Sequence, residues 1–151
     1  MQDSKLAIRK SIVVDTPVET AFRVFTEGIA TWWPMHKYSV SEERTRSVTM
    51  ERRVGGRLYE TDADGAAHEW GTVTSWDPPN AVSFTWHPGY DDPSVHTVVT
   101  VSFSADGERT RVELTHSDWE NLGERAKEMV QRYTAGWDEV LGAFADAAGG
   151  S

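Results

Sequence analysis

The histidines and acidic residues are the groups of this sequence that could do proton-transfer or metal chemistry, and their spacing matches no familiar active site. The histidines are His36, His68, His87, His96 and His116. They form neither H-x-H nor H-E-x-x-H, and no Asp or Glu stands at a spacing that would orient a histidine as a general base. The chain also lacks G-x-S-x-G, a P-loop and G-x-G-x-x-G. We therefore predict no metal site and no cofactor, and binding is favoured over catalysis.

Aromatic side chains are the other conspicuous feature, above all in TWWPMHKYSV, residues 31–40. Each buried ring gains about 4 to 6 kcal/mol of gross transfer free energy, from ~150 to 250 Å² at ~25 cal/mol per Å². We expect this segment, which Pro34 breaks so that it is neither a regular helix nor a strand, to fold over one end of an apolar groove. The predicted ligand-binding residues are Trp32, Trp33, Met35, Tyr59, Trp70, Trp86, His116, Met129, Tyr133 and Trp137.

For any one of those rings, packing in an ordinary core is the first expectation, ahead of contact with a ligand. An aromatic stripe at helical spacing belongs to a core more often than to a pocket, and an inward histidine such as His116 is more often a satisfied core group than a catalyst. Among the polar residues, Glu60, His87 and Tyr90 are expected near the groove or its entrance, which residues 87–96 would form. Both interpretations remain open at the level of sequence.

Two segments are predicted to be helices. In the first, from Thr16 to Gly28, Thr16 and Glu19 fit a capping box around Pro17, and apolar residues recur at helical spacing. The second runs from about 120 to 147 with one apolar face that begins at Ala126. Gly136 lies inside this helix, where glycine costs roughly 0.5 to 1 kcal/mol relative to alanine. Close approach of a ring or strand explains it better than a kink.

Most of the chain between these helices alternates between apolar and polar residues, as strands do. The expected strands are 6–14, 46–53, 57–62, 67–76, 80–86, 95–104 and 109–117, separated by short turns. Short connections imply antiparallel neighbours, with inward faces at residues 82, 84 and 86, at 99, 101 and 103, and at 112, 114 and 116. This order predicts an α+β fold, in which a curved antiparallel sheet of six or seven strands wraps around a long C-terminal helix.

Length and charge limit the function classes. A chain of 151 residues has the size of one domain, here 1–151 with its core at about 8–146. A net charge of -9 and a pI of about 4.9 argue against nucleic acid and anionic membranes as partners. No apolar run has the length of a membrane span and the start lacks a signal-peptide core, so we expect a cytoplasmic protein. The absence of cysteine removes disulfides and thiolate nucleophiles.

Several stretches resemble the SRPBCC or START-like superfamily, which has the helix-grip fold, and within it the family named for the activator of heat-shock-protein-90 ATPase homologue. They are TPVETAFRVFT leading to TWWP, GGRLYE (55–60), EWGTVTSWDPPNAVSFTW (69–86), and the late GW (136–137) before DEVLGAF. The resemblance covers about residues 8–146. It implies the predicted fold with a cavity between sheet and last helix. Members of the superfamily include lipid carriers, hormone receptors, polyketide cyclases and co-chaperone domains, so the fold does not assign a function.

Three functions follow as hypotheses. The favoured one is a protein that holds a hydrophobic, aromatic or lipid-like small molecule in the cavity. The second is a cyclase or hydrolase acting on a polyketide-like or phenolic substrate, in which His116, Tyr59, Glu60 or Tyr133 would move a proton. The third, implied by the resemblance, is a co-chaperone-like interaction domain. The free edges of such a sheet are also compatible with a homodimer.

Overall fold

The sheet of this protein has seven antiparallel strands in the order β1-β7-β6-β5-β4-β3-β2. The computed structural model describes residues 7–34, 37–87 and 96–149. The strands are β1 (Ile8–Val14), β2 (Thr45–Met50), β3 (Arg57–Asp62), β4 (Ala67–Asp77), β5 (Ala81–Trp86), β6 (Thr97–Asp106) and β7 (Arg109–Ser117). The helices are α1 (Val18–Thr26), α2 (Ile29–Trp32) and α3 (Ala126–Ala147), with short 3-10 helices η2 (Glu42–Arg44) and η3 (Trp119–Arg125). The predicted α+β helix-grip fold is therefore confirmed.

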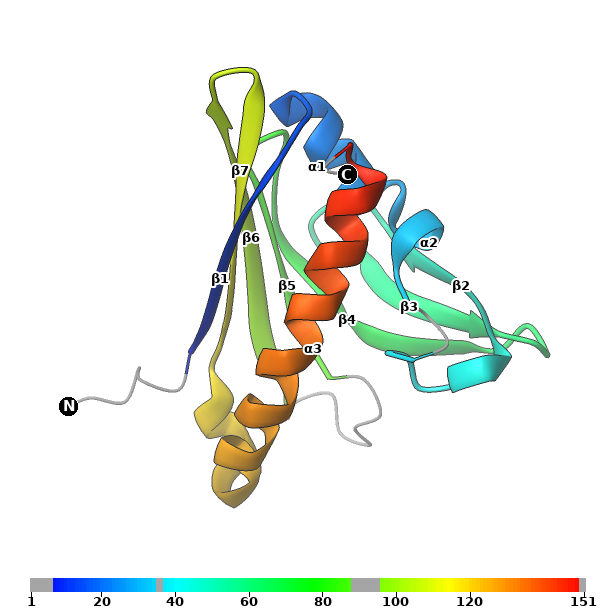
Figure 1. Ribbon diagram of the computed structural model, residues 1–151. Helices are drawn as coiled ribbons and strands as arrows, with labels where there is room; N and C mark the ends of the chain where they lie inside the picture. The colour runs from blue at the N-terminus through cyan, green and yellow to red at the C-terminus, as the bar shows by residue number, and fades with distance from the viewer. Residues whose placement is uncertain (1–6, 35–36, 88–95, 150–151) are drawn as a thin grey trace.

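The sheet curves around the C-terminal helix. Figure 1 shows β1, β7 and β6 on one side of α3 and β2 and β3 on the other, with α1 and α2 beside the end of α3 that carries the C-terminus. The curvature has a local cause at Gly71 of β4, where an added β-carbon would overlap the carbonyl oxygen of Thr85 in β5. Opposite Gly71 the register with β3 shifts between Leu58 and Tyr59. A glycine and a bulge together bend the strand and turn the sheet.

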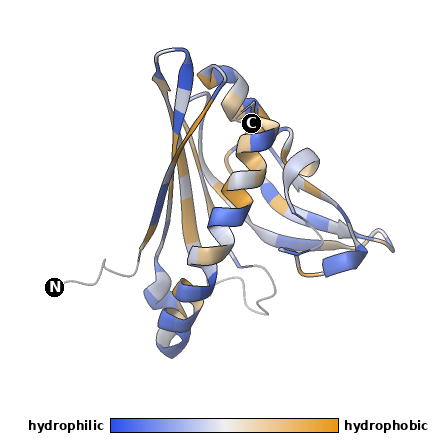
Figure 2. Ribbon diagram, viewed as in Figure 1, coloured by the Kyte–Doolittle hydropathy of each residue, from blue (hydrophilic) through white to orange (hydrophobic). Residues whose placement is uncertain are grey.

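Burial alternates along the strands as the sequence predicts. Val82, Phe84 and Trp86 of β5 are buried, and so are the inward residues of β6 and β7. Figure 2 shows the corresponding mixture of apolar and polar positions along strands and helix. On the concave face these side chains pack against Trp137, Leu141 and other buried residues of α3. This packing fixes the helix against the sheet.

Several details of the predicted helices are wrong. Pro17, not Thr16, is the N-cap of α1, and no side chain caps that helix. The Thr16 carbonyl instead accepts a hydrogen bond from Thr110 Oγ1 in β7 at 2.7 Å. The residues from 119 to 125 form a 3-10 helix interrupted at Gly123, whose φ of 62° ends the regular geometry, so that α3 begins only at Ala126. At the start of α1, a hydrogen bond to β7 therefore takes the place of the predicted local cap.

Two further differences lie close to the aromatic segment. Trp32 completes the short helix α2 rather than an irregular stretch. Strand β2 ends at Met50, three residues earlier than expected, since the chain turns there towards β3. Within the residues that the structure describes, no helix is long and apolar enough to cross a membrane.

Candidate ligand-binding cleft

An open cleft of about 500 Å³ lies between α3 and residues 37–41, which we call the strap. It is lined by Trp33, Lys37, Tyr38, Ser39, Val40, Trp86, Met129, Arg132, Tyr133, Gly136, Trp137 and Val140. Ligand sites in proteins span about 300 to 1,000 Å³ and are mostly apolar with a few polar groups. The size and the lining of this cleft both fall within that description.

Indole rings form the floor of the cleft. Trp33, Trp86 and Trp137 contact one another, with ring centroids 5.7 to 6.1 Å apart in tilted or edge-to-face geometry. Each is at most 6% exposed. Beneath them, Trp70 packs on both Trp33 and Trp86 at 5.1 and 5.4 Å. The deep part between sheet and helix is thus filled by interlocking rings, and the space for a ligand lies above them, open to solvent.

The strap is fastened to α3 through Glu139. Lys37 Nζ donates to both carboxylate oxygens of Glu139, at 2.9 and 3.1 Å, and the Tyr38 hydroxyl donates to Oε1 at 2.9 Å. These hydrogen bonds lower the pKa of Glu139 and raise that of Lys37. On the inner side, Trp33 Nε1 donates to the Tyr38 carbonyl at 2.8 Å. The strap therefore forms one wall of the cleft, facing α3.

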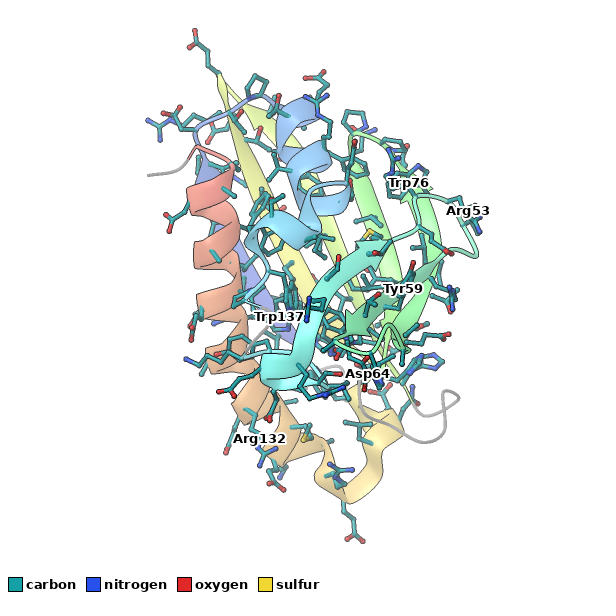
Figure 3. All side chains as sticks on the ribbon, turned by 90° about the vertical axis from the view of Figure 1, so that its right-hand side faces the viewer. Arg53, Tyr59, Asp64, Trp76, Arg132 and Trp137 are labelled. Carbon is teal, nitrogen blue, oxygen red and sulfur yellow. The ribbon has the colours of Figure 1, made fainter. Side chains whose placement is uncertain are left out.

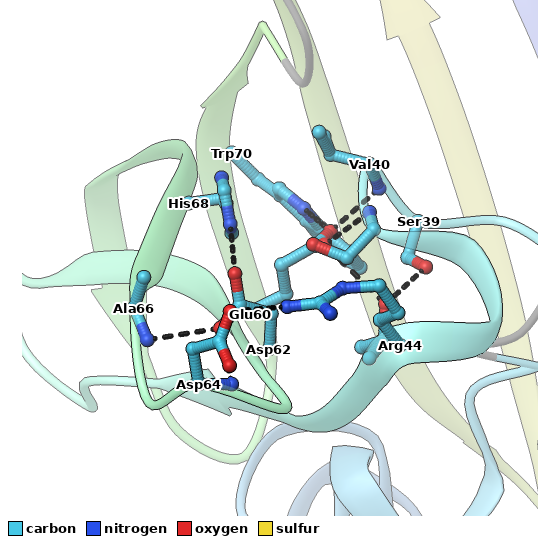
Figure 4. A network of polar contacts seen from close by, with 11 residues as sticks. Ser39, Val40, Arg44, Glu60, Asp62, Asp64, Ala66, His68 and Trp70 are labelled. Carbon is cyan, nitrogen blue, oxygen red and sulfur yellow. Dashed lines mark hydrogen bonds and ion pairs between the residues drawn. The ribbon is translucent and has the colours of Figure 1, made fainter.

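The other end of the strap is fastened to β3 by Glu60, which is fully buried. Its carboxyl group accepts hydrogen bonds from the backbone N–H groups of Val40 and Ser41, at 2.7 and 2.6 Å, and from Trp70 Nε1 at 2.6 Å (Figure 4). Thr45 Oγ1 donates more weakly at 3.4 Å. Glu60 therefore links the strap to the floor, and its oxygens are used within the protein.

Gly136 lets the strap approach α3. A β-carbon at this position would lie 3.4 Å from the ring of Tyr38, at the edge of ordinary van der Waals contact. The close approach of a ring, predicted for this glycine, is therefore what the structure shows. A larger side chain here would enter the cleft.

His116 lies below the floor with no exposed surface and with both ring nitrogens bonded. Trp137 Nε1 donates to Nδ1 at 3.0 Å, so the neutral ring carries its proton on Nε2, which donates to Thr97 Oγ1 at 2.6 Å. Thr97 Oγ1 in turn donates to the Trp86 carbonyl at 3.3 Å. Burial lowers the pKa of His116 to about 3. A neutral ring without a spare lone pair is unsuited to act as a base on a ligand.

Tyr133 is the polar group that reaches the cleft from α3. Its hydroxyl oxygen accepts a hydrogen bond from Trp86 Nε1 at 3.2 Å. Burial raises its pKa, which keeps the hydroxyl protonated. No described residue accepts a hydrogen bond from this hydroxyl. Arg132 follows the same helix, with its side chain largely exposed and 3.9 Å from Glu128 (Figure 3).

Apart from Tyr59, the structure places the predicted binding residues that it describes at different depths. Trp33, Trp86, Met129, Tyr133 and Trp137 line the cleft. Trp32, Trp70 and His116 lie beneath it, in the packed layer. Met35 lies outside the described residues, as do Tyr90 and most of the predicted entrance loop.

Tyr59 corrects one prediction, because it is on the outer face of β3. Its neighbours Leu58 and Glu60 are buried on the concave face, and strand alternation turns Tyr59 the other way. There the guanidinium of Arg57 lies 4.6 Å from its ring centroid. Tyr59 is therefore no part of the cleft.

Sequence reasoning missed most of the rim. Lys37, Tyr38, Ser39, Val40, Arg132 and Val140 line the cleft without having been predicted. Two signals in the sequence did mark this surface: four of these residues belong to the segment 31–40, which was expected to fold over one end of the groove, and Gly136 was noted for its place beside Trp137. The histidine pairing was missed as well: His68 Nε2 lies 2.8 Å from Asp62, and His87 Nε2 lies 3.5 Å from Glu69. Neither pair lines the cleft.

A family model and several solved structures match most of this chain. The chain matches the family model described as Activator of Hsp90 ATPase homolog 1-like protein over residues 15–149. It is 30% identical to the anthrahydroquino-gamma-pyrone synthase Txn09 complexed with SUM, over 97% of this chain and 99% of that one, with a TM-score of 0.63. It is also 30% identical to the self-sacrificing resistance protein CalC from Micromonospora echinospora, over 97% and 96%, with a TM-score of 0.70.

A more distant structure has the same fold. The Aha1 dimer from Colwellia psychrerythraea is 19% identical over 94% of this chain and 95% of that one, with a TM-score of 0.67. No curated protein matches the sequence.

Proposed function

The chain belongs to the family of Activator of Hsp90 ATPase homolog 1-like proteins, and on that premise we propose that it binds a flat, largely apolar aromatic small molecule in the cleft between α3 and the strap. The observation that carries this proposal is the cleft itself, a volume of about 500 Å³ above a floor of three tryptophans. Ring-on-ring contacts contribute about 0.5 to 1.5 kcal/mol each beyond the burial of apolar area. A planar ligand makes several such contacts here.

The surroundings of the floor support binding more than catalysis. His116 and Glu60 were candidates to move a proton, and both are bonded within the protein. Tyr59 lies on the opposite face of the sheet. Among the described residues, what remains towards the ligand is an apolar surface with polar groups at its rim, and none of these groups is placed as a nucleophile or base.

A second candidate function, an enzyme acting on a polyketide-like or phenolic substrate, is favoured by the similarity to Txn09, which is named as a synthase. In that case Tyr133 is the cleft residue placed to donate a proton. The two functions differ in one observable: mass spectrometry after incubation recovers a bound aromatic ligand unchanged from a carrier and converted from an enzyme.

The proposal is tested by filling the cleft from α3. Gly136→Leu places a side chain between the helix and Tyr38, so we expect naphthalene to bind at least tenfold more weakly than to the unmodified protein. Gly142→Leu is the matched control, because Gly142 is exposed on the same helix and has open space around it. Calorimetric titration with naphthalene measures the effect.

Unchanged naphthalene affinity in Gly136→Leu would move the site away from this cleft. Absence of naphthalene binding by the unmodified protein, or equal loss in both leucine variants, would count against the proposed function.

A further inference from the structure

The polar side chains that the structure describes along the cleft can all donate hydrogen bonds. Among the described lining residues, Lys37 and Arg132 are cationic, Tyr38, Ser39 and Tyr133 carry hydroxyl groups, and none is Asp or Glu. This contrasts with the protein as a whole, whose net charge is -9. Lys37 already uses its ammonium on Glu139. The two cations and the hydroxyl donors therefore favour a ligand that carries hydrogen-bond acceptors.

Tyr133 is the donor best placed to meet a ligand. The Trp86 indole N–H occupies a lone pair of its oxygen, which fixes the hydroxyl over the floor and polarises its O–H bond. Because the pKa of Tyr133 is raised by burial, the hydroxyl keeps its proton well above neutral pH. Among the described residues, no acceptor receives that proton. In a cleft open to solvent, the acceptor is water or an atom of a bound molecule.

We propose that the ligand is an aromatic ring system carrying an acceptor oxygen, a ketone or quinone carbonyl, and that this oxygen accepts a hydrogen bond from the Tyr133 hydroxyl. The inference rests on the proposed function and narrows its ligand class. The rings lie on the indoles of Trp86 and Trp137, while the oxygen points to the donor at the cleft wall. A plain hydrocarbon would cover the Tyr133 hydroxyl without bonding it.

A ligand that covers the Tyr133 hydroxyl without accepting its hydrogen bond binds more weakly than one that accepts it. A hydrogen bond made or lost in such a site changes affinity by roughly tenfold. Tyr133 is thus the residue that separates carbonyl-bearing ligands from hydrocarbons of the same shape.

A pair of probes with one ring skeleton tests this inference. 1,4-Naphthoquinone and naphthalene share two fused rings, and only the quinone has carbonyl oxygens; with no cysteine in the chain, the quinone meets no thiol. We expect the unmodified protein to prefer naphthoquinone by about tenfold. Tyr133→Phe should abolish that preference, and the readout is the ratio of the two affinities measured within each variant. Tyr59→Phe, on the outer face of β3, is the control and should retain the preference.

The outcomes separate the two proposals. Equal affinity of the unmodified protein for both probes, or a preference that survives in Tyr133→Phe, overturns the role of Tyr133 while the proposed function stands. Failure of both probes to bind overturns the proposed function. If Tyr133→Phe does not fold, infrared spectroscopy of naphthoquinone bound to the unmodified protein decides: hydrogen bonding shifts its carbonyl stretch to lower frequency, and an unshifted band contradicts the inference.

Discussion

At the scale of single residues, His116 shows how burial selects a protonation state. The ring lies under the cleft, with an indole N–H on Nδ1 and a threonine hydroxyl at Nε2. Protonation of Nδ1 would place two donors face to face and would put a charge in a dry aromatic layer. The folded state therefore requires the neutral ring, and protonation of His116 at low pH lowers the free energy of unfolding.

The predicted consequence is a stability that falls on acidification. The pKa of His116 is about 3 when folded and returns to its ordinary value of 6.5 on unfolding. Between these values the unfolded chain binds more protons, so the free energy of unfolding drops by up to about 1.4 kcal/mol per pH unit as the pH falls. Urea unfolding at about pH 7.5, 5.5 and 4.5 measures it. His116→Gln should show a shallower slope, and an unchanged slope would contradict the assignment.

Asp62 affects stability at lower pH than His116, so the two contributions can be measured separately. The hydrogen bond from His68 and those from the backbone N–H groups of Ala66 and Asp64 lower its pKa to about 2. Its contribution to stability is present above its ordinary value of 3.8 and is lost below that value. The interval above about pH 4.5 therefore reports mainly on His116.

At the scale of elements, the strap is positioned by two acidic side chains from distant parts of the chain. Glu60 of β3 holds its backbone from below, and Glu139 of α3 holds Lys37 and Tyr38 from outside. The second anchor is exposed and contributes little to stability. The first is buried and accepts hydrogen bonds from the backbone N–H groups of Val40 and Ser41, which lie outside the strands and have no partner among the described residues of the sheet. The wall of the cleft thus depends chiefly on Glu60.

Glu60→Gln tests this anchor. The amide keeps one acceptor oxygen but turns an NH2 group towards backbone or indole N–H donors, so at least one buried donor loses its partner. We expect the free energy of unfolding to fall by about 1 to 3 kcal/mol. The control is Glu43→Gln, an exposed position on η2 that should change little. Chemical denaturation measures both, and equal stability of the two variants would assign Glu60 no anchoring role.

At the scale of the whole molecule, one layer of rings joins the parts of the fold. It connects α2 through Trp33, β4 and β5 through Trp70 and Trp86, and α3 through Trp137. Phe25, Phe103 and Phe144 continue it towards α1. The layer fills the depth between sheet and helix, and this is why the cleft lies above it rather than enclosed within the fold.

Trp137→Ala removes the ring at which helix, sheet and His116 meet. The loss of buried area and the cavity left behind should lower the free energy of unfolding by about 3 to 5 kcal/mol. Tyr59→Ala, which removes a half-buried ring from the outer face, serves as the comparison and should cost less. Urea unfolding checks both; a loss below about 1 kcal/mol for Trp137→Ala would mean that the ring layer does not hold the molecule together.

The periodicities of the sequence predicted the strands, their inward faces and the apolar face of α3, because burial on one side repeats every two residues in a strand and every three to four in a helix. Residue types alone also identified Trp86, Tyr133 and Trp137 as neighbours of a groove. These features depend on local chain geometry, which can be predicted from the pattern of residue types along the sequence.

Only the tertiary structure decided which rings face the cleft and which lie beneath it. Glu60 points inwards and Tyr59 outwards against what their polarity suggests, because the donors that satisfy Glu60 come from the strap, some 20 residues away. Gly136 faces the ring of Tyr38, which lies about a hundred residues earlier in the chain. Contacts over such distances in sequence depend on how the sheet curves and on where the strap crosses α3, and no local pattern encodes either.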